Sequence, residues 1–254
     1  MREQSGVKSF LQNLIYSLKA VSELSSFIVF LSIFLIFFIP GFLVIFKILG
    51  LGAFLTERLV YTSSAFKIFI GEVTFVISFL LIIFSVGALF CYKLYFLVAN
   101  NFSIFSFLKR SLAFFPKFLI ATFVQGVVAL VGLIAIIIPG VYYGSSLMFF
   151  NFFTVYGNST LKSAFANSRS LAKSLRLESL LTFVVYLSIF FIFIYFVSIS
   201  HLSEMYSALT YSILISYWIV SYSNAVFHLA DKNLNELNKG SVLYRDIRGS
   251  FNNR

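Results

Sequence analysis

Long apolar stretches dominate this chain, and short polar segments separate them. Six of the stretches are apolar on every helical face: residues 27–46, 73–97, 118–138, 141–156, 180–199 and 208–227. A membrane-spanning helix needs about 20 apolar residues, whereas strands of a membrane barrel alternate apolar and polar positions. The pattern therefore predicts an all-α, polytopic integral membrane protein with six transmembrane helices in a single membrane domain, residues 1–230.

The fourth stretch, 141–156, is the shortest of the six. It contains small and polar residues, namely Gly144, Ser145, Ser146 and Asn151. A short polar span can tilt against its neighbours, thin the bilayer around it or turn back before crossing. All three alternatives stay open at the level of sequence.

A polar segment with a helical apolar stripe precedes each pair of spans, over residues 5–25, 102–115 and 159–176. The stripe of the first segment contains Val7, Phe10, Leu11, Leu14, Ile15 and Leu18. The stripe of the third contains Leu161, Ala164, Phe165, Ser168, Leu171, Ala172 and Leu175, and Ser159 or Thr160 is expected to cap its helix. Such helices either lie in the membrane interface or cap the cytoplasmic end of the helix bundle.

Composition and charge confirm the membrane class and add an orientation. The 254 residues are 60% hydrophobic and 11% charged, with a mean hydropathy of +0.96, which excludes an ordinary soluble domain. Sixteen of the 19 Lys and Arg residues fall on one side of the predicted topology, and only Lys47, Arg58 and Lys67 fall on the other. The positive-inside rule then places both termini, with the basic tail 231–254, in the cytoplasm of a bacterial inner membrane.

The net charge of +10 is interpreted as a membrane-surface layer, and no nucleic-acid partner is expected. The residues predicted to contact anionic lipid headgroups are Lys109, Arg110, Lys162, Arg169, Lys173 and Arg176. Lys93, near the cytoplasmic end of the second span, is expected to reach phosphates in the same way. A protein partner or a homo-oligomer stays open. Cys91 is the only cysteine, so an intramolecular disulfide is excluded.

Two Pro-Gly pairs are predicted to form structural turns. They occur in the similar tetrapeptides Phe38-Ile39-Pro40-Gly41 and Ile137-Ile138-Pro139-Gly140. Proline lacks the amide hydrogen that a helix needs and glycine tolerates positive φ, so each pair is suited to ending a helix and reversing the chain. Together with the amphipathic segments, the pairs suggest a repeated unit of one amphipathic segment and two spans.

The region 102–181 resembles a known family. Its segments are 107–112 (Phe-Leu-Lys-Arg-Ser-Leu), 133–142 with its Ile-Ile-Pro-Gly-Val-Tyr end, and 164–174, which begins Ala-Phe-Ala-Asn-Ser-Arg-Ser. In this order they resemble the membrane domain of glycerophosphoryl diester phosphodiesterases and its six-helix bacterial relatives. The resemblance implies an inner-membrane protein without assigned activity, since the phosphodiesterase chemistry of the fused members belongs to a separate soluble domain. The family's Arg, Pro and acidic residue after the turn are replaced here by Ser146, Phe152 and Tyr156.

The search for catalytic or metal-binding residues yields no candidate. The sequence has neither a His-Glu-x-x-His motif nor a Gly-x-Ser-x-Gly motif, and no carboxylate falls in the middle of a predicted span. His201 and His228 are expected on opposite sides of the membrane. No enzyme activity, cofactor or metal is therefore predicted.

A small polar group, Gln125, Ser146 and Asn151, either lines a polar path or joins helices by hydrogen bonds. The leading functional prediction is a non-enzymatic inner-membrane protein that engages anionic lipids or partner proteins in envelope maintenance. The alternative is a transporter of small solutes or lipids, for which the polar group and the Pro-Gly pairs are the motive.

Overall fold

The computed structural model describes residues 2–48, 64–98, 104–135, 137–156, 160–199 and 204–238. Every regular element in these ranges is a helix. The bounds are α1 Arg2–Ala20, α2 Leu24–Ile48, α4 Ser64–Val98, α5 Ile104–Ala135, α6 Ile137–Leu147, α7 Phe150–Val155, α8 Leu161–Ser174, α9 Arg176–Ile199 and α10 Glu204–Asn238. The predicted all-α class is confirmed for this part of the chain.

Four stretches of these helices are long and apolar enough to cross a membrane: Val76–Leu94, Phe107–Ala129, Arg176–Phe196 and Leu209–Leu234. A fifth candidate arises if Val7–Ala20 and Leu24–Phe38 count as one broken span, although the two helices are bent by 70°. The described residues therefore offer four to five candidate spans where the sequence predicts six.

Large apolar side chains cover the outside of the candidate spans. On α4 they include Val76, Ile77 and Phe79, and on α9 Phe191 and Tyr195, all more than 40% exposed. Contiguous apolar surface of this kind marks a lipid-facing or partner-facing region. Together with the length and composition of the helices, it supports a membrane protein.

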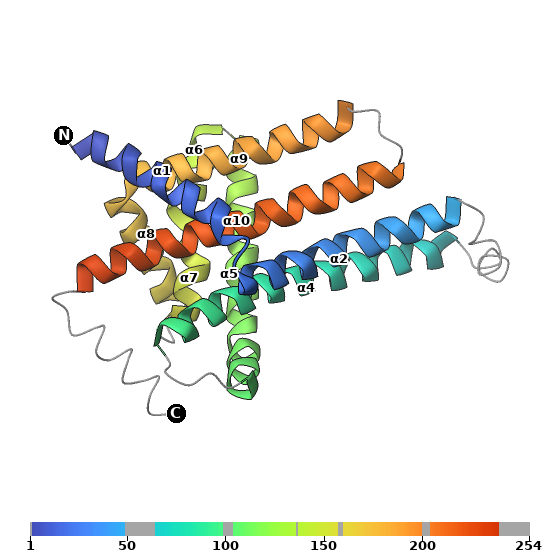
Figure 1. Cartoon of the computed structure of the whole chain (residues 1–254), viewed down its shortest axis with the longest axis horizontal. Helices are drawn as coiled ribbons and strands as arrows, with labels where there is room; N and C mark the ends of the chain where they lie inside the picture. Colours follow the sequence, from blue (N-terminus) through green and yellow to red (C-terminus); the bar gives the residue numbers. More distant parts are fainter. Residues whose placement is uncertain are drawn as a thin grey trace.

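The helices run in two directions (Figure 1). α2 with α4, and α9 with α10, form antiparallel pairs along the long axis of the molecule, and α10 also contacts α2. α5 runs crosswise to these pairs, with α6 and α7 beside it. The beginning of α1 and the end of α10 lie toward one end of the long axis, while the end of α9 and the beginning of α10 lie toward the other.

The expected fourth span, 141–156, is not a continuous helix. It is divided between α6, of 11 residues, and α7, of 6 residues, with a turn at Met148 and Phe149. α7 contacts α4, α5, α8 and α10, and Phe149 and Phe152 are completely buried. A segment that is apolar on all sides is buried in either protein or lipid, and here the protein itself covers it.

The second amphipathic segment, 102–115, is not separate from the third span, 118–138. A single helix, α5, runs from Ile104 to Ala135 with Pro116 inside it. Proline removes one backbone hydrogen bond from a helix interior, yet here the helix continues through it. The predicted boundary between an amphipathic segment and a span is therefore wrong here, because one helix contains both.

The two Pro-Gly pairs differ in structure, which removes the main argument for a repeated unit. Pro40 and Gly41 lie inside α2, which continues to Ile48, so they form no turn. Pro139 and Gly140 lie in the first turn of α6, where a missing amide hydrogen is tolerated. The chain reverses just before them, because α5 and α6 contact each other across this point.

The hairpin of α5 and α6 depends on two glycines that face each other. A Cβ added to Gly132 would lie 2.6 Å from the Gly140 Cα atom, closer than real Cβ contacts allow. Backbone-to-backbone packing of this kind requires residues without side chains.

The expected boundary between the membrane domain and the tail, near residue 230, falls inside α10. The helix continues to Asn238, and Leu229 and Ala230 belong to the main hydrophobic core with residues of α4, α5, α7 and α8. The rest of the tail, 239–254, lies outside the described residues.

Candidate functional site

The basic residues predicted in the third amphipathic segment lie on α8 and at the start of α9. Thr160 begins α8 as its N-cap, with extended backbone (φ −71°, ψ 157°), and its hydroxyl accepts a hydrogen bond from the Ser163 amide at 3.3 Å. This satisfies one of the free amides of the first turn. The expected cap is therefore confirmed at Thr160, whereas Ser159 lies outside the described residues.

One face of α8 is fixed in the protein. Ala164, Leu171 and Ala172 are buried in the main hydrophobic core, and the Ser168 hydroxyl donates to the Ser146 carbonyl at 3.1 Å. The apolar stripe predicted from the sequence thus faces α6 and α7 and not lipid. Of the two interpretations left open, α8 follows the one in which the helix caps the bundle.

The opposite face of α8 is exposed and basic. Lys162, Arg169 and Lys173 are exposed, as is Arg176 in the first turn of α9. Lys162, Arg169 and Lys173 are separated by seven and four residues, which places them on one face of α8, and Arg176 follows in the first turn of α9. The Arg169 guanidinium lies 5.9 Å from the centroid of the Phe165 ring, a cation–π contact. We call these four residues the basic stripe.

The other two predicted headgroup contacts are not part of the basic stripe, because both belong to α5. Lys109 is exposed. Arg110 lies in the helix, but its side chain lies outside the described part of the structure.

α1 is amphipathic in the opposite sense. Its buried face contains Phe10, Asn13, Ser17 and Ala20, whereas Val7, Leu11, Ile15 and Leu18 form an exposed apolar stripe. Lys8 and Lys19 are exposed beside that stripe. A helix with an exposed apolar stripe flanked by lysines is suited to the membrane interface. There the apolar side chains contact acyl chains and the amines reach the headgroups.

A polar seam fixes the buried face of α1 to the rest of the protein. The Tyr186 hydroxyl of α9 lies 2.7 Å from the Ser17 hydroxyl of α1 and 2.7 Å from the Ser221 hydroxyl of α10. The Tyr217 hydroxyl donates to the Leu18 carbonyl at 3.3 Å. Sequence reasoning missed this seam because its members are far apart along the chain and serine alone carries no signal.

The indole of Trp218 continues the packing beside the seam. Its Nε1 donates to the Tyr186 carbonyl at 2.6 Å, and its ring lies 4.9 Å from the Phe190 ring. The burial of a tryptophan within a span is thereby explained by an internal hydrogen bond.

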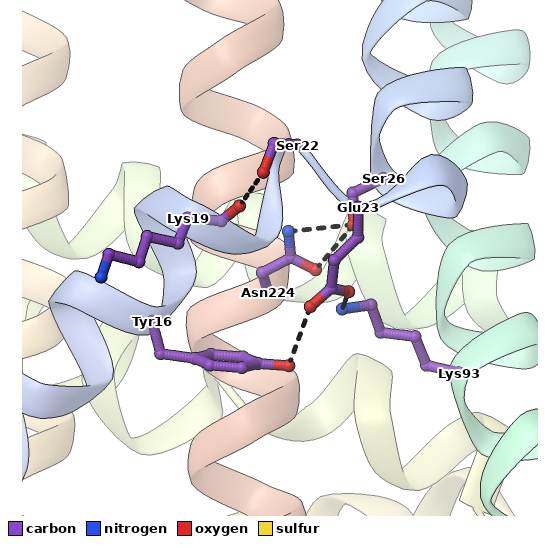
Figure 2. Close-up of polar contacts among 7 residues, drawn as sticks. All are labelled: Tyr16, Lys19, Ser22, Glu23, Ser26, Lys93 and Asn224. Atoms are coloured by element: carbon purple, nitrogen blue, oxygen red, sulfur yellow. Dashed lines mark hydrogen bonds and ion pairs between the residues drawn. The ribbon is translucent and has the colours of Figure 1, made fainter.

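The bend between α1 and α2 is held by charged and polar side chains (Figure 2). The Lys93 amine lies 3.2 Å from the Glu23 Oε2 atom, and the Tyr16 hydroxyl donates to the other carboxylate oxygen, Oε1, at 3.5 Å. The Ser26 hydroxyl and the Asn224 amide exchange hydrogen bonds of 3.2 and 3.3 Å. These contacts join α1 and α2 to α4 and α10.

Lys93 differs from its expected role. Its side chain is only 10% exposed, and the amine lies 5.9 Å from the Phe227 ring centroid. The amine is paired with Glu23 instead of reaching lipid phosphates, because α1 and α2 cover this end of α4. His228 stacks on Tyr16, with ring centroids 4.0 Å apart, and His201 lies outside the described residues.

The predicted polar path is divided. The Asn151 amide donates to the Gln125 oxygen at 3.2 Å, and the Thr122 hydroxyl donates to the Asn151 oxygen at 3.3 Å. Ser146 is separate and donates to the Tyr143 carbonyl at 2.9 Å. Gln125, Thr122 and Asn151 therefore join α5 to α7, the interhelical role considered for them above.

Gly144 provides a close helix contact, as its small neighbours suggest. A Cβ added there would collide with the Phe183 ring of α9. A separate apolar hollow between α4 and α5, lined by Gly87, Ser111 and Phe118 among others, is too small for a water molecule. Within the described residues, no group of three His, Cys, Asp or Glu side chains is placed to hold a metal ion.

No protein-family model, curated protein or solved structure matches the chain. The resemblance to the membrane domain of glycerophosphoryl diester phosphodiesterases therefore stays a prediction.

Proposed function

We propose that this chain is a non-enzymatic protein of the bacterial inner membrane that holds anionic lipid headgroups in envelope maintenance. The observation that carries the proposal is the basic stripe, Lys162, Arg169, Lys173 and Arg176. Three of its members are exposed on α8, whose other face is fixed in the core, and Arg176 is exposed at the start of α9. A rigidly presented row of cations can meet several headgroups at once, whereas flexible tail residues must first be ordered.

The surroundings of the basic stripe favour lipid over a protein partner. Asn167, Ser170 and Ser174 are exposed beside it on α8, and no large apolar side chain is exposed within Leu161–Ser174. Protein interfaces usually centre on buried aromatic or aliphatic anchors, whereas attraction to an anionic leaflet needs only charge, about 1 kcal/mol for each basic residue near the surface.

The proposed orientation places both termini in the cytoplasm. It rests on the sixteen-to-three distribution of Lys and Arg. The beginning of α1 and the end of α10 also lie toward the same end of the molecule as α8 (Figure 1). The outward apolar stripe of α1, at that same end, provides a second contact with the inner leaflet, through acyl chains.

The test removes the charge of the basic stripe and leaves its helix intact. The quadruple variant K162Q/R169Q/K173Q/R176Q is reconstituted in vesicles that contain trace photoactivatable phosphatidylglycerol or phosphatidylcholine. We expect cross-linking to the anionic lipid to fall several-fold toward the level of the zwitterionic lipid, and an envelope defect in cells that carry the variant.

The matched control is N167A/S170A/S174A, which changes exposed residues of the same helix without changing charge. It should cross-link like the unmodified protein. Unchanged anionic cross-linking in the quadruple variant would sink the lipid proposal. An envelope defect without a change in lipid cross-linking would point instead to a protein partner at the same stripe.

A transporter is the second function considered from the sequence, but no specific contact favours it. Its motive was the polar group Gln125, Ser146 and Asn151. Gln125 and Asn151 bond to each other and Ser146 to its own helix, so each of the three side chains makes a hydrogen bond within the protein.

A further inference from the structure

The direction of α5 conflicts with its composition. Its segment Phe107–Ala129 is long and apolar enough to span a membrane, as are segments of α4, α9 and α10. However, α5 runs crosswise to those three helices, which share one direction with α2 (Figure 1). Spanning helices are tilted by about 0–40° from the bilayer normal, so helices that cross one another in this way cannot all span the same flat bilayer.

The candidate spans of α4, α9 and α10 share one direction, so we take the membrane normal to lie along these helices. α5 is then the one candidate span that does not follow the membrane normal. It crosses α4 at Gly87, where a Cβ would lie 3.3 Å from the Phe118 ring, and Phe90 and Phe118 have ring centroids 5.9 Å apart. Gly87 lies inside the candidate span Val76–Leu94 and closer to Leu94, the end that the proposed orientation puts in the cytoplasm. The crossing therefore falls at the depth of the inner leaflet.

The exposed face of α5 is apolar along nearly the whole helix. It comprises Phe105, Leu108, Leu112, Ile120, Phe123, Val127 and Val131, all more than 40% exposed. The exposed Pro116 fills the gap between Leu112 and Ile120, so the positions follow one another at three- or four-residue intervals. Ser111, Phe118 and Ala121 lie on the buried side.

We propose that α5 lies in the plane of the membrane, in its cytoplasmic half, with this stripe against lipid acyl chains. An in-plane helix satisfies its own backbone hydrogen bonds, so it is permitted at membrane depth. The exposed Lys109 amine then extends from the stripe to the nearby headgroups.

The proposal leaves the charge-based orientation unchanged. Residues 118–161 contain no Lys, Arg, Asp or Glu. The positive-inside rule therefore gives no prediction of whether this region crosses the bilayer. With α5 in the plane, the crossing helices are α2, α4, α9 and α10. An even number of crossings again puts both termini on one side. The proposal shares the membrane setting with the proposed function but does not depend on headgroup binding by α8.

Nitroxide depth measurements test whether α5 lies in the plane of the membrane. Single cysteines are introduced at Leu112, Ile120, Val127 and Val131 in a C91A background, spin-labelled and reconstituted in bacterial phospholipid vesicles. Accessibility to oxygen and to a water-soluble nickel chelate then gives the depth of each label. We expect one constant depth in the inner leaflet along α5.

The reference helix is α9, with labels at its exposed residues Leu177, Val184, Phe191 and Tyr195. Their depth should increase to the bilayer centre and decrease again. The same rise and fall along α5 would overturn the proposal. Labels on α5 that are protected from both oxygen and nickel would overturn the lipid assignment and indicate that protein covers the stripe.

Thiol labelling of intact cells provides a second measurement. If α5 crossed the bilayer, the exposed Tyr142 of α6 would lie near the outer surface. We expect Y142C to show no reaction with a membrane-impermeant maleimide, whereas T56C, in the link between α2 and α4, reacts. Labelling of Y142C at the level of T56C would show that α5 spans.

Discussion

α1 and α8 lie near the same end of the molecule (Figure 1), and both have apolar residues at helical spacing opposite polar ones. α8 turns its apolar residues inward, onto α6 and α7, and exposes Lys162, Arg169 and Lys173. α1 turns Ser17 and Asn13 inward and exposes Leu11 and Ile15. The same pattern therefore produces a core helix with a basic outer face in one case and an interfacial helix with a polar inner face in the other.

Amphipathic spacing therefore predicts that a helix has an apolar and a polar face, but it does not predict which of the two faces is covered by protein. Against α8, the protein offers the aromatic side chains of α7, such as Phe150, whose ring contacts Phe165. Against α1, it offers the hydroxyls of Tyr186 and Ser221. The buried Ser17 hydroxyl of α1 thereby has the partner that a buried polar group needs, whereas the buried Asn13 amide has no hydrogen-bond partner in the described part of the structure.

The largest contrast is expected from one substitution made in both helices. Leu171→Ala removes a buried core side chain of α8 and should lower the free energy of unfolding by about 2–5 kcal/mol. Leu11→Ala on the exposed stripe of α1 should change it by less than about 1 kcal/mol. Thermal unfolding in detergent measures both. Equal losses would mean that the two leucines have similar surroundings.

A smaller loss is expected from breaking the seam of α1. Tyr186→Phe leaves the Ser17 and Ser221 hydroxyls buried without this partner. It should lower the free energy of unfolding by about 1–3 kcal/mol. It should release α1, measured as faster proteolysis within residues 2–20, without a change around α8. Tyr195→Phe, at an exposed tyrosine of the same helix, serves as the control. Protection of α1 that stays the same in Y186F would contradict the role of the seam.

The hydrogen bond of Ser168 on the inner face of α8 should contribute less. Ser168→Ala removes the hydrogen bond to the Ser146 carbonyl and is expected to lower the unfolding free energy by about 1 kcal/mol. Ser170→Ala, on the exposed side of α8, should have no measurable effect. Chemical or thermal denaturation compares the two, and an equal effect would show that Ser168 makes no net contribution.

The smallest effect concerns the outer face of α8. Arg169→Ala removes the contact with the Phe165 ring and should lower stability by about 0.5–1 kcal/mol. Lys162→Ala, which removes an exposed charge at the helix start, is the comparison. If both variants unfold at the same temperature as the unmodified protein, the guanidinium is not held by the ring.

Much of the fold could be predicted because apolar length and helical period are local properties. The runs 73–97, 180–199 and 208–227 lie within α4, α9 and α10, and the segment 159–176 contains α8. The exposure of the basic residues of α8 also followed from their spacing. By contrast, the ion pair of Lys93 with Glu23 joins residues that are 70 positions apart. No local sequence pattern predicts such a pair.

The run 141–156 shows where prediction from hydropathy fails. Its apolar character was read as a span, yet α7 is buried by α4, α5, α8 and α10. Hydropathy measures how strongly a segment avoids water, and both a lipid bilayer and a protein core satisfy that preference. The same ambiguity applied to the Pro-Gly pairs, of which one lies inside α2 and the other begins α6.

The order of residues is enough to show that the chain is helical and apolar enough for a membrane, and its Lys and Arg positions favour one orientation. Which face of each amphipathic helix meets protein, which apolar run forms the core and in which direction α5 lies are known only once the helices are packed. Spacing along a helix records the relative arrangement of side chains around its axis. The direction of that axis, and what covers each face, depend on the neighbouring helices.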